Sequence, residues 1–254
     1  MTPLTGNQIL VQGASRGIGL AITEKILARD SKSFVMATYR GPLNQAKSLT
    51  NLQGKYANRL RLTSLDLESE TSIENAASEV KLITNEIDRI INVAGILHEE
   101  NLSPEKRLTD IRPSNFEKVM RINALGALLV AKWFSPLMTK DRISQFINIS
   151  ARVGSISDNQ LGGWYSYRCS KAALNMITRN LSIELKRKLP KVICAAIHPG
   201  TTDTTLSKPF QRNVQPDRLS TPQETAVKIL DVTDNLTYYQ NGSFLSTEGE
   251  SIPW

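Results

Sequence analysis

Short apolar runs and amphipathic stretches alternate along the chain. The apolar runs have the length and composition of buried strands and cover residues 7–12, 33–38, 59–65, 89–91, 145–149, 192–197 and 243–246. Between them, apolar side chains recur every three or four residues, which predicts helices over 20–27, 42–54, 70–86, 113–138, 163–185 and 222–234. Strands and helices that alternate in this way predict a doubly wound α/β fold with a mainly parallel sheet.

The alternation continues over residues 1–254 without a linker or a composition break, so we expect a single domain. Two segments interrupt it. Residues 96–114 are polar and irregular, which predicts a loop with a short helix. Residues 201–220 are rich in Thr, Ser and Pro, which predicts a second loop. We also expect the helix over 113–138 to pause near Asn123.

The charge balance changes this picture little. The 31 Lys and Arg residues exceed the 24 Asp and Glu residues, which gives a net charge of +7. Most of these charges are scattered. The one dense run, Lys186-Arg187-Lys188, falls where the long helix ends before Pro190 and complements the helix dipole. We therefore expect no nucleic-acid partner, because an anionic cofactor explains the basic balance more economically.

The sequence also indicates in which cellular compartment the protein lies. No apolar run approaches the roughly 20 residues that a membrane-spanning helix needs, and the first residues lack the basic-then-apolar order of a signal peptide. The two cysteines, Cys169 and Cys194, have no metal-ligand spacing, so we interpret them as small buried thiols in a reducing compartment. These features predict a cytoplasmic protein with no membrane partner and no metal site.

A glycine cluster follows the first strand directly. The segment Gly13-Ala14-Ser15-Arg16-Gly17-Ile18-Gly19 joins that strand to a helix, with the spacing Gly-x3-Gly-x-Gly. Glycines let the backbone approach phosphates, and a helix N-terminus offers free N–H groups and a positive dipole end. An ordinary turn can have the same composition, but the position between a strand and a helix favours a pyrophosphate site.

The end of the second strand indicates which dinucleotide is bound. An acidic residue there binds the 2′-hydroxyl of NAD, whereas a basic residue accommodates the 2′-phosphate of NADP. This strand ends in Tyr39-Arg40 with no acidic neighbour, and Arg16 of the glycine cluster is placed to reach the same phosphate. Although each arginine alone is equally consistent with a solvated surface side chain, the two together favour NADP(H) over NAD(H).

Tyr167 and Lys171 lie four residues apart at the start of the long helix, on the same helix face. An ammonium beside a phenol favours the phenolate and lowers a pKa that is otherwise about 10. A phenol tuned in this way gives a proton to a substrate oxygen or takes one from it. A solvated Tyr and Lys on a helix surface is the alternative interpretation of the pair alone.

Five motifs occur together in a fixed order. They are Gly13-x3-Gly17-x-Gly19, Asn92-x-Ala94-Gly95, Asn123, Tyr167-x3-Lys171 and Pro199-Gly200. In this order and spacing, nearly the whole chain resembles the short-chain dehydrogenase/reductase family. The runs 150–155, 162–167 and 249–254 resemble a narrower branch, which contains the C-factor-like proteins and the sniffer-type carbonyl reductases. The resemblance implies a Rossmann-type domain with a seven-stranded sheet, and a homo-oligomer, dimer or tetramer, formed through the long helices.

The resemblance also implies roles for single residues. Tyr167 would be the general acid/base, Lys171 would hold the nicotinamide ribose and lower the pKa of the tyrosine, and Asn123 would anchor a water in a proton relay. Asp66 would meet the adenine, with capping of the next helix as the alternative. The implied cofactor contacts are Gly13, Ser15, Arg16, Ile18, Gly19, Arg40, Asp66, Leu67, Asn92, Ala94, Gly95, Tyr167, Lys171, Pro199, Gly200, Thr202 and Thr204.

One departure from the family pattern concerns the catalytic serine. Anchored on the end of the strand, its column holds Ala151, with Ser150 one place earlier. Counting back from Tyr167 by the usual spacing lands on Gly154, one place before Ser155. Because a loop absorbs extra residues and a strand end does not, we expect Ser150 to be the donor that orients the carbonyl oxygen, with Ser155 as the alternative.

Together these features predict an NADP(H)-dependent carbonyl reductase, or the corresponding alcohol dehydrogenase, that acts on a small molecule. Specificity would lie in segments 96–112 and 201–220. An alternative is a dinucleotide-binding sensor or signalling protein like the C-factor, with vestigial catalysis. The set Tyr167, Lys171 and Asn123 favours the enzyme, whereas Ala151 argues mildly against it. A sugar-nucleotide epimerase or dehydratase ranks last, because it needs a larger substrate region than residues 201–254 supply.

Overall fold

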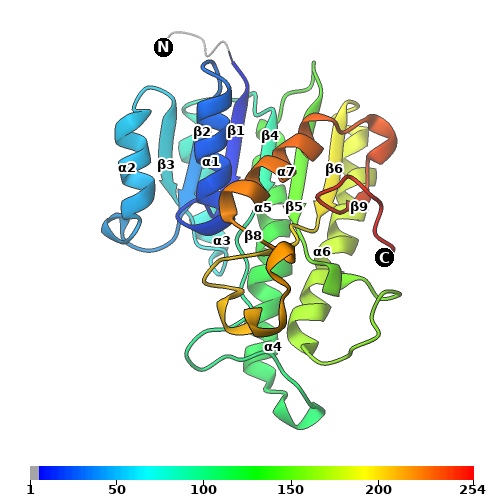
Figure 1. Ribbon diagram of the computed structural model, residues 1–254. Helices are drawn as coiled ribbons and strands as arrows, with labels where there is room; N and C mark the ends of the chain where they lie inside the picture. Colours follow the sequence, from blue (N-terminus) through cyan, green and yellow to red (C-terminus); the bar gives the residue numbers. More distant parts are fainter. Residues whose placement is uncertain (1–5) are drawn as a thin grey trace.

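Seven strands form one parallel sheet in the computed structural model, which describes residues 6–254 (Figure 1). In spatial order they are β3 Leu60–Ser64, β2 Phe34–Tyr39, β1 Gln8–Gln12, β4 Arg89–Asn92, β5 Ser144–Ile149, β6 Val192–Ile197 and β9 Ser243–Leu245. The chain moves outward from β1 on one side and from β4 on the other, so the strand order reverses between them. The predicted doubly wound Rossmann-type fold with seven strands is confirmed, and this reversal opens a crevice at the carboxyl ends of the strands.

Helices cover both faces of the sheet (Figure 1). Helices α1 Gly17–Arg29, α2 Lys47–Lys55 and α7 Pro222–Asp234 pack on one face, and α3 Glu70–Lys81, α4 Pro113–Met120, α5 Gly126–Phe134 and α6 Tyr165–Glu184 pack on the other. Successive strand residues point to opposite faces, so Leu10 joins the core beneath α3, α5 and α6 while Val11 joins the core beneath α1 and α7. Burial on both faces explains why β6 and the centre of β1 read as continuous apolar runs, and β5 is fully buried although it includes Ser144, Gln145 and Asn148.

The expected pause near Asn123 is a turn of π-helix. Residues Arg121–Leu125 form this wider turn between α4 and α5, so the two helices run on as one interrupted rod. The rod ends at Phe134, four residues before the predicted end at Met138, and a 3-10 turn over Ser135–Leu137 follows. Pro136 explains the early end, because proline lacks the N–H that an α-helix needs.

Several local expectations were wrong in detail. Segment 201–220 holds a short parallel pair, β7 Thr201–Thr202 and β8 Leu219–Ser220, and a 3-10 helix over Lys208–Asn213. The helix predicted over 70–86 ends at Lys81, and the one over 42–54 begins with a separate 3-10 turn. Cys169 is exposed and not buried, whereas Cys194 lies in the core.

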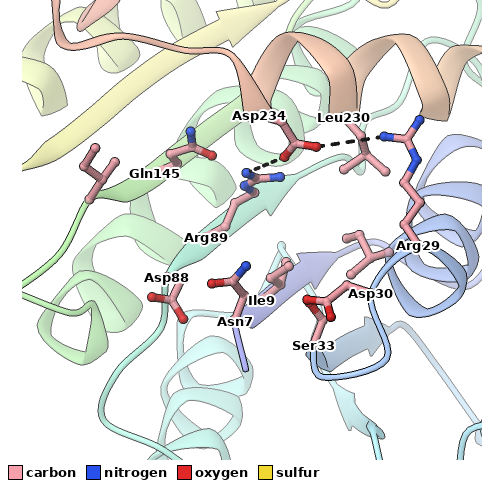
Figure 2. A pocket seen from close by; sticks show the side chains of 12 residues that line it. Asn7, Ile9, Arg29, Asp30, Ser33, Asp88, Arg89, Gln145, Leu230 and Asp234 are labelled. Atoms are coloured by element: carbon pink, nitrogen blue, oxygen red, sulfur yellow. Dashed lines mark hydrogen bonds and ion pairs between the residues drawn. The ribbon is translucent and has the colours of Figure 1, made fainter. Parts of the chain in front are cut away.

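A second cavity lies at the other end of the sheet, where β1, β4 and β5 begin between α1 and α7 (Figure 2). Its volume is about 230 Å³, and its polar walls are held by side chains that pair with one another. Arg89 donates to Asp234 at 2.8 Å, and Arg29 lies 2.8 Å from Asp231 and 3.9 Å from Asp234. Because these arginines are already paired with α7, we interpret the cavity as part of the α1–α7 packing.

Among residues 6–254, no helix combines the length and the apolar character that a membrane crossing requires.

Candidate active site

The glycine loop forms a tight turn between β1 and α1. Gly13 has φ +80° and Gly17 has φ +54°, values that L-residues other than glycine rarely adopt. A Cβ on Gly19 would lie 2.1 Å from the carbonyl oxygen of Gly13, so only glycine lets the helix start this close to the strand. The N-cap, Arg16, makes no side-chain cap hydrogen bond. The first N–H groups of α1 therefore remain available to an anion.

A groove of about 460 Å³ begins at this loop and follows the carboxyl ends of the strands. Most of the predicted cofactor contacts line it, namely Gly13, Ser15, Arg16, Ile18, Gly19, Arg40, Asp66, Leu67, Ala94, Gly95 and Thr204. Six predicted contacts are not among its lining residues, namely Asn92, Tyr167, Lys171, Pro199, Gly200 and Thr202. The groove is large, it starts at a phosphate-sized glycine cradle, and it carries two arginines, so these residues fit a dinucleotide.

Arg40 and Asp66, which were predicted to meet the adenosine half of the cofactor, both line the groove. Arg40 is half exposed at the end of β2, and its Nη1 lies 3.7 Å from Oε2 of Glu68. Asp66 accepts the backbone N–H of Glu68 at 3.0 Å, whereas Ser69 is the N-cap of α3. Asp66 therefore shapes the turn before the helix and does not cap it, and its place in the groove wall agrees with the predicted adenine contact.

Tyr167 and Lys171 lie on successive turns of α6, with the Lys171 Nζ atom 5.8 Å from the centre of the Tyr167 ring. Both are buried, at 8% and 3% exposure. The Lys171 Nζ donates to the Ile149 carbonyl at 2.9 Å. The pair also lies beside the end of the groove, because a Cβ on Gly95 would sit only 3.5 Å from that same Nζ.

Asn123 connects the π-helical turn to this pair. Its Oδ1 accepts the N–H of Ile96 at 2.7 Å, and its Nδ2 donates to the Ile96 carbonyl at 2.8 Å and to Ser170 Oγ at 3.0 Å. Ser170 in turn donates to the Tyr167 carbonyl at 2.8 Å. The side chain of Asn123 thus joins the segment just after β4 to α6.

Burial dominates the protonation of the pair. It raises the pKa of Tyr167 above its usual value of about 10 and lowers the pKa of Lys171 to about 8. The expected lowering of the tyrosine pKa by Lys171 is therefore not what the structure shows. Withdrawal from water disfavours both charged forms, and here it outweighs their mutual attraction.

The two candidate serines are both buried, at 2% exposure each. Ser150 donates its hydroxyl to Oδ1 of Asn175 on α6 at 2.6 Å. Ser155 accepts the backbone N–H of Asp158 at 3.2 Å. Neither is among the residues that line the groove. To serve a substrate, Ser150 would have to release Asn175, so its predicted role as a donor stays a prediction.

The predicted site residues that follow β6 do not all lie near the groove. Thr204 lies close to the glycine loop, since a Cβ on Gly17 would be 3.3 Å from its methyl group, whereas Thr202 pairs with Thr225 of α7 at 2.8 Å. His198 accepts the backbone N–H of Arg152 at 3.2 Å, and burial lowers its pKa to about 4. It is therefore neutral at pH 7.

A cluster of aromatic rings near Tyr167 did not emerge from the sequence. Trp164 packs edge-to-face on Tyr167 at 6.2 Å and on Phe210 at 5.0 Å, and His98 packs on Phe210 at 5.7 Å. The His98 Nε2 also lies 3.1 Å from the Thr205 carbonyl. The cluster joins segments 96–112 and 201–220 above the tyrosine, and no periodic pattern marks such loop residues in advance.

A glycine loop at the strand-order reversal of a parallel sheet, with a buried Tyr–Lys pair beside it, is typical of a dinucleotide-binding oxidoreductase. The family model for short chain dehydrogenases matches residues 7–215. The NADPH-bound carbonyl reductase from chicken fatty liver is 31% identical and has a TM-score of 0.87, over 98% of this chain and 99% of that one.

Two further similarities concern the predicted resemblance to the C-factor-like proteins and the sniffer-type carbonyl reductases. Carbonyl reductase Sniffer of D. melanogaster shares the fold, with a TM-score of 0.85 at 24% identity over 98% of this chain and 99% of that one. The C-signal of Myxococcus xanthus is 29% identical over 70% of this chain and 99% of its own length. The chain belongs to the short-chain dehydrogenase family of nicotinamide-dependent oxidoreductases, and the predicted resemblance to the sniffer and C-factor branch is confirmed.

Proposed function

We propose that this chain is an NADP(H)-dependent carbonyl reductase in which Tyr167 is the general acid/base. The observation that carries the proposal is the position of Tyr167 and Lys171. Both are buried on one face of α6, beside the Gly95 end of a groove that fits a dinucleotide. A buried acid at the end of a cofactor groove is placed to act on an oxygen at the reacting carbon.

The preference for NADP(H) rests on charge. Arg16 and Arg40 line the groove where the adenosine ribose would lie, and an arginine accommodates a 2′-phosphate. The similar carbonyl reductase from chicken fatty liver binds NADPH, which supports the same choice here.

Tyr167, Lys171 and Asn123 each have a separate role in the proposed carbonyl reduction. When bound, NADPH would supply the hydride to the carbonyl carbon. Tyr167 gives its phenolic proton to the carbonyl oxygen, and its raised pKa keeps that proton in place until the oxygen becomes basic. Lys171, fixed by the Ile149 carbonyl, places a positive charge beside the developing phenolate, and Asn123 holds α6 against the segment just after β4.

The substrate side of Tyr167 is bordered by rings. Trp164 packs on the tyrosine and Phe210 packs on Trp164, and this apolar surface suits a carbonyl compound with an apolar or aromatic body.

NADPH oxidation against a panel of aldehydes, ketones, quinones and keto esters tests the proposal. We expect turnover on at least one aromatic or apolar carbonyl, with NADPH preferred over NADH. The similarity to the C-signal supports a second candidate, a dinucleotide-binding signalling protein. Tight NADPH binding without turnover on any member of the panel would favour that candidate and overturn the reductase.

A further inference from the structure

Glu105 is a buried carboxylate that the proposed reaction does not use. It belongs to the irregular segment 96–112, and only 4% of its surface is exposed. A buried carboxylate needs hydrogen-bond partners. One residue of α6 supplies a partner for each of the two carboxylate oxygens. Ser166 donates its backbone N–H to Glu105 Oε2 at 3.1 Å and its hydroxyl to Oε1. The backbone carbonyl of Glu105 also accepts the N–H of Trp164 at 2.5 Å.

Helix α6 has no cap of its own. Its N-cap, Trp164, has the left-handed backbone angles φ 51° and ψ 42°, makes no side-chain cap bond, and is followed by a first turn without an acidic residue. By contrast, α3 and α7 begin with Ser69 and Thr221, which cap their own helices. The first N–H groups of a helix need acceptors, and a carboxylate there also complements the helix dipole. Glu105 supplies both from 61 residues away along the chain.

The capped turn is the one that carries the proposed acid. Ser166 directly precedes Tyr167, and the Trp164 ring packs on the Tyr167 ring. The segment that holds Glu105 is itself fixed, because Asp110 accepts the N–H groups of Lys106 and Arg107 at 3.0 Å each. Movement of Glu105 would therefore move the start of α6, and with it the tyrosine.

We propose that Glu105 is a positioning residue, which caps α6 from segment 96–112 and so fixes Tyr167 and Trp164 relative to the substrate side of the site. The kinetic part of this inference rests on the proposed reductase function. The capping part rests only on the contacts of Glu105.

The kinetic test compares Glu105→Ala, Glu105→Gln and Glu100→Ala, the last being the matched removal of an exposed carboxylate from the same segment. We expect Glu105→Ala to lower kcat at least about tenfold, because small misplacements of a catalytic group are costly. The Kd for NADPH should stay within about twofold, because other elements form the groove. Glu105→Gln keeps an acceptor for the Ser166 N–H and should recover most of the loss, and Glu100→Ala should match the unchanged protein. A kcat for Glu105→Ala within twofold of the unchanged protein would overturn the positioning role.

Hydrogen exchange tests the cap without any turnover. In the NADPH complex, the amides of residues 164–168 should exchange about threefold to thirtyfold faster in Glu105→Ala, which is the effect expected from the loss of a helix cap. Glu100→Ala should leave them unchanged. Equal exchange in Glu105→Ala and the unchanged protein would overturn the proposal. If Glu105→Ala does not fold, Ser166→Ala, which removes the hydroxyl contact to Glu105, replaces it in both tests. If no carbonyl is reduced but exchange accelerates as expected, the reductase fails and the cap stands.

Discussion

At the scale of single residues, burial decides the chemistry of the site. Tyr167 and Lys171 are withdrawn from water together, so the phenol retains its proton and the ammonium releases its own more readily. In that state Tyr167 holds the proton that an acid must carry before it can donate to a carbonyl oxygen.

Replacing Tyr167 by Phe removes the proposed acid while keeping the ring that packs on Trp164. We expect turnover to fall roughly 10²–10⁴-fold, because a positioned acid contributes that much. NADPH affinity, measured by fluorescence titration, should stay nearly constant. Tyr165→Phe, two residues earlier in the same helix turn, is the matched control. More than about a tenth of the original turnover in Tyr167→Phe would show that another group is the acid.

The hydroxyl groups of Ser150 and Ser155 differ in their hydrogen-bond partners. Ser150 donates to Asn175 inside the fold, so we expect Ser150→Ala to lower the melting temperature and to reduce kcat less than about tenfold. Ser155→Ala is the paired variant. A loss of roughly 10²-fold in kcat for either one, the effect of removing an oxyanion donor, would identify that serine as the donor to the carbonyl oxygen.

Arg40 is the residue that tests the proposed cofactor preference most directly. A charge-assisted contact to a phosphate contributes about 1.5–3 kcal/mol, so Arg40→Ala should weaken NADPH binding at least roughly tenfold and leave NADH binding nearly unchanged. Isothermal titration with both cofactors measures this. Arg61→Ala, an exposed arginine on the neighbouring strand β3, should change neither. Equal affinity of the unchanged protein for NADPH and NADH would contradict the assignment.

At the scale of elements, the interrupted rod α4–α5 shows how an irregular turn serves a site. The π turn Arg121–Leu125 carries Asn123, whose amide binds the backbone of Ile96 on one side and Ser170 on the other. A regular helix would turn the residue by a different angle, so the irregularity and the contacts belong together.

Asn123→Ala should therefore destabilise the fold as well as the site. It leaves the N–H and the carbonyl of Ile96 without their partner, at a cost of about 1–3 kcal/mol for each buried group. We expect the free energy of unfolding, measured in urea, to fall by at least about 2 kcal/mol. Asn75→Ala, which changes an exposed asparagine of α3, should cost less than about 0.5 kcal/mol. Equal losses for the two variants would show that the Ile96 contacts contribute little.

At the scale of the whole molecule, α5 and α6 leave apolar side chains in solvent. Leu128 of α5 is 40% exposed, and Met176 and Ile183 of α6 are 61% and 49% exposed. Exposed apolar side chains on two helices that contact each other offer a surface that a second copy of the chain can cover.

We expect a homo-oligomer formed through this surface. Light scattering after gel filtration should give at least a dimer, and Leu128→Glu or Met176→Glu should shift it toward the monomer. Ile156→Glu, which changes a 78% exposed side chain in the loop after β5, should have no effect. A monomer at high micromolar concentration would show that the exposed residues are not an interface.

The sequence by itself determined the fold class, the order of the elements and the place of the glycine loop, because periodicity and glycine spacing are local properties of a chain. It also located Tyr167, Lys171 and Asn123, whose roles follow from their motifs and remain to be tested. Only the tertiary structure showed that burial outweighs the lysine in setting the tyrosine pKa, that Ser150 is engaged by Asn175, and that Glu105 caps the helix of Tyr167. These facts depend on which residues far apart in the sequence come into contact, and on how far the fold excludes water from them. Neither property can be read from a local sequence pattern.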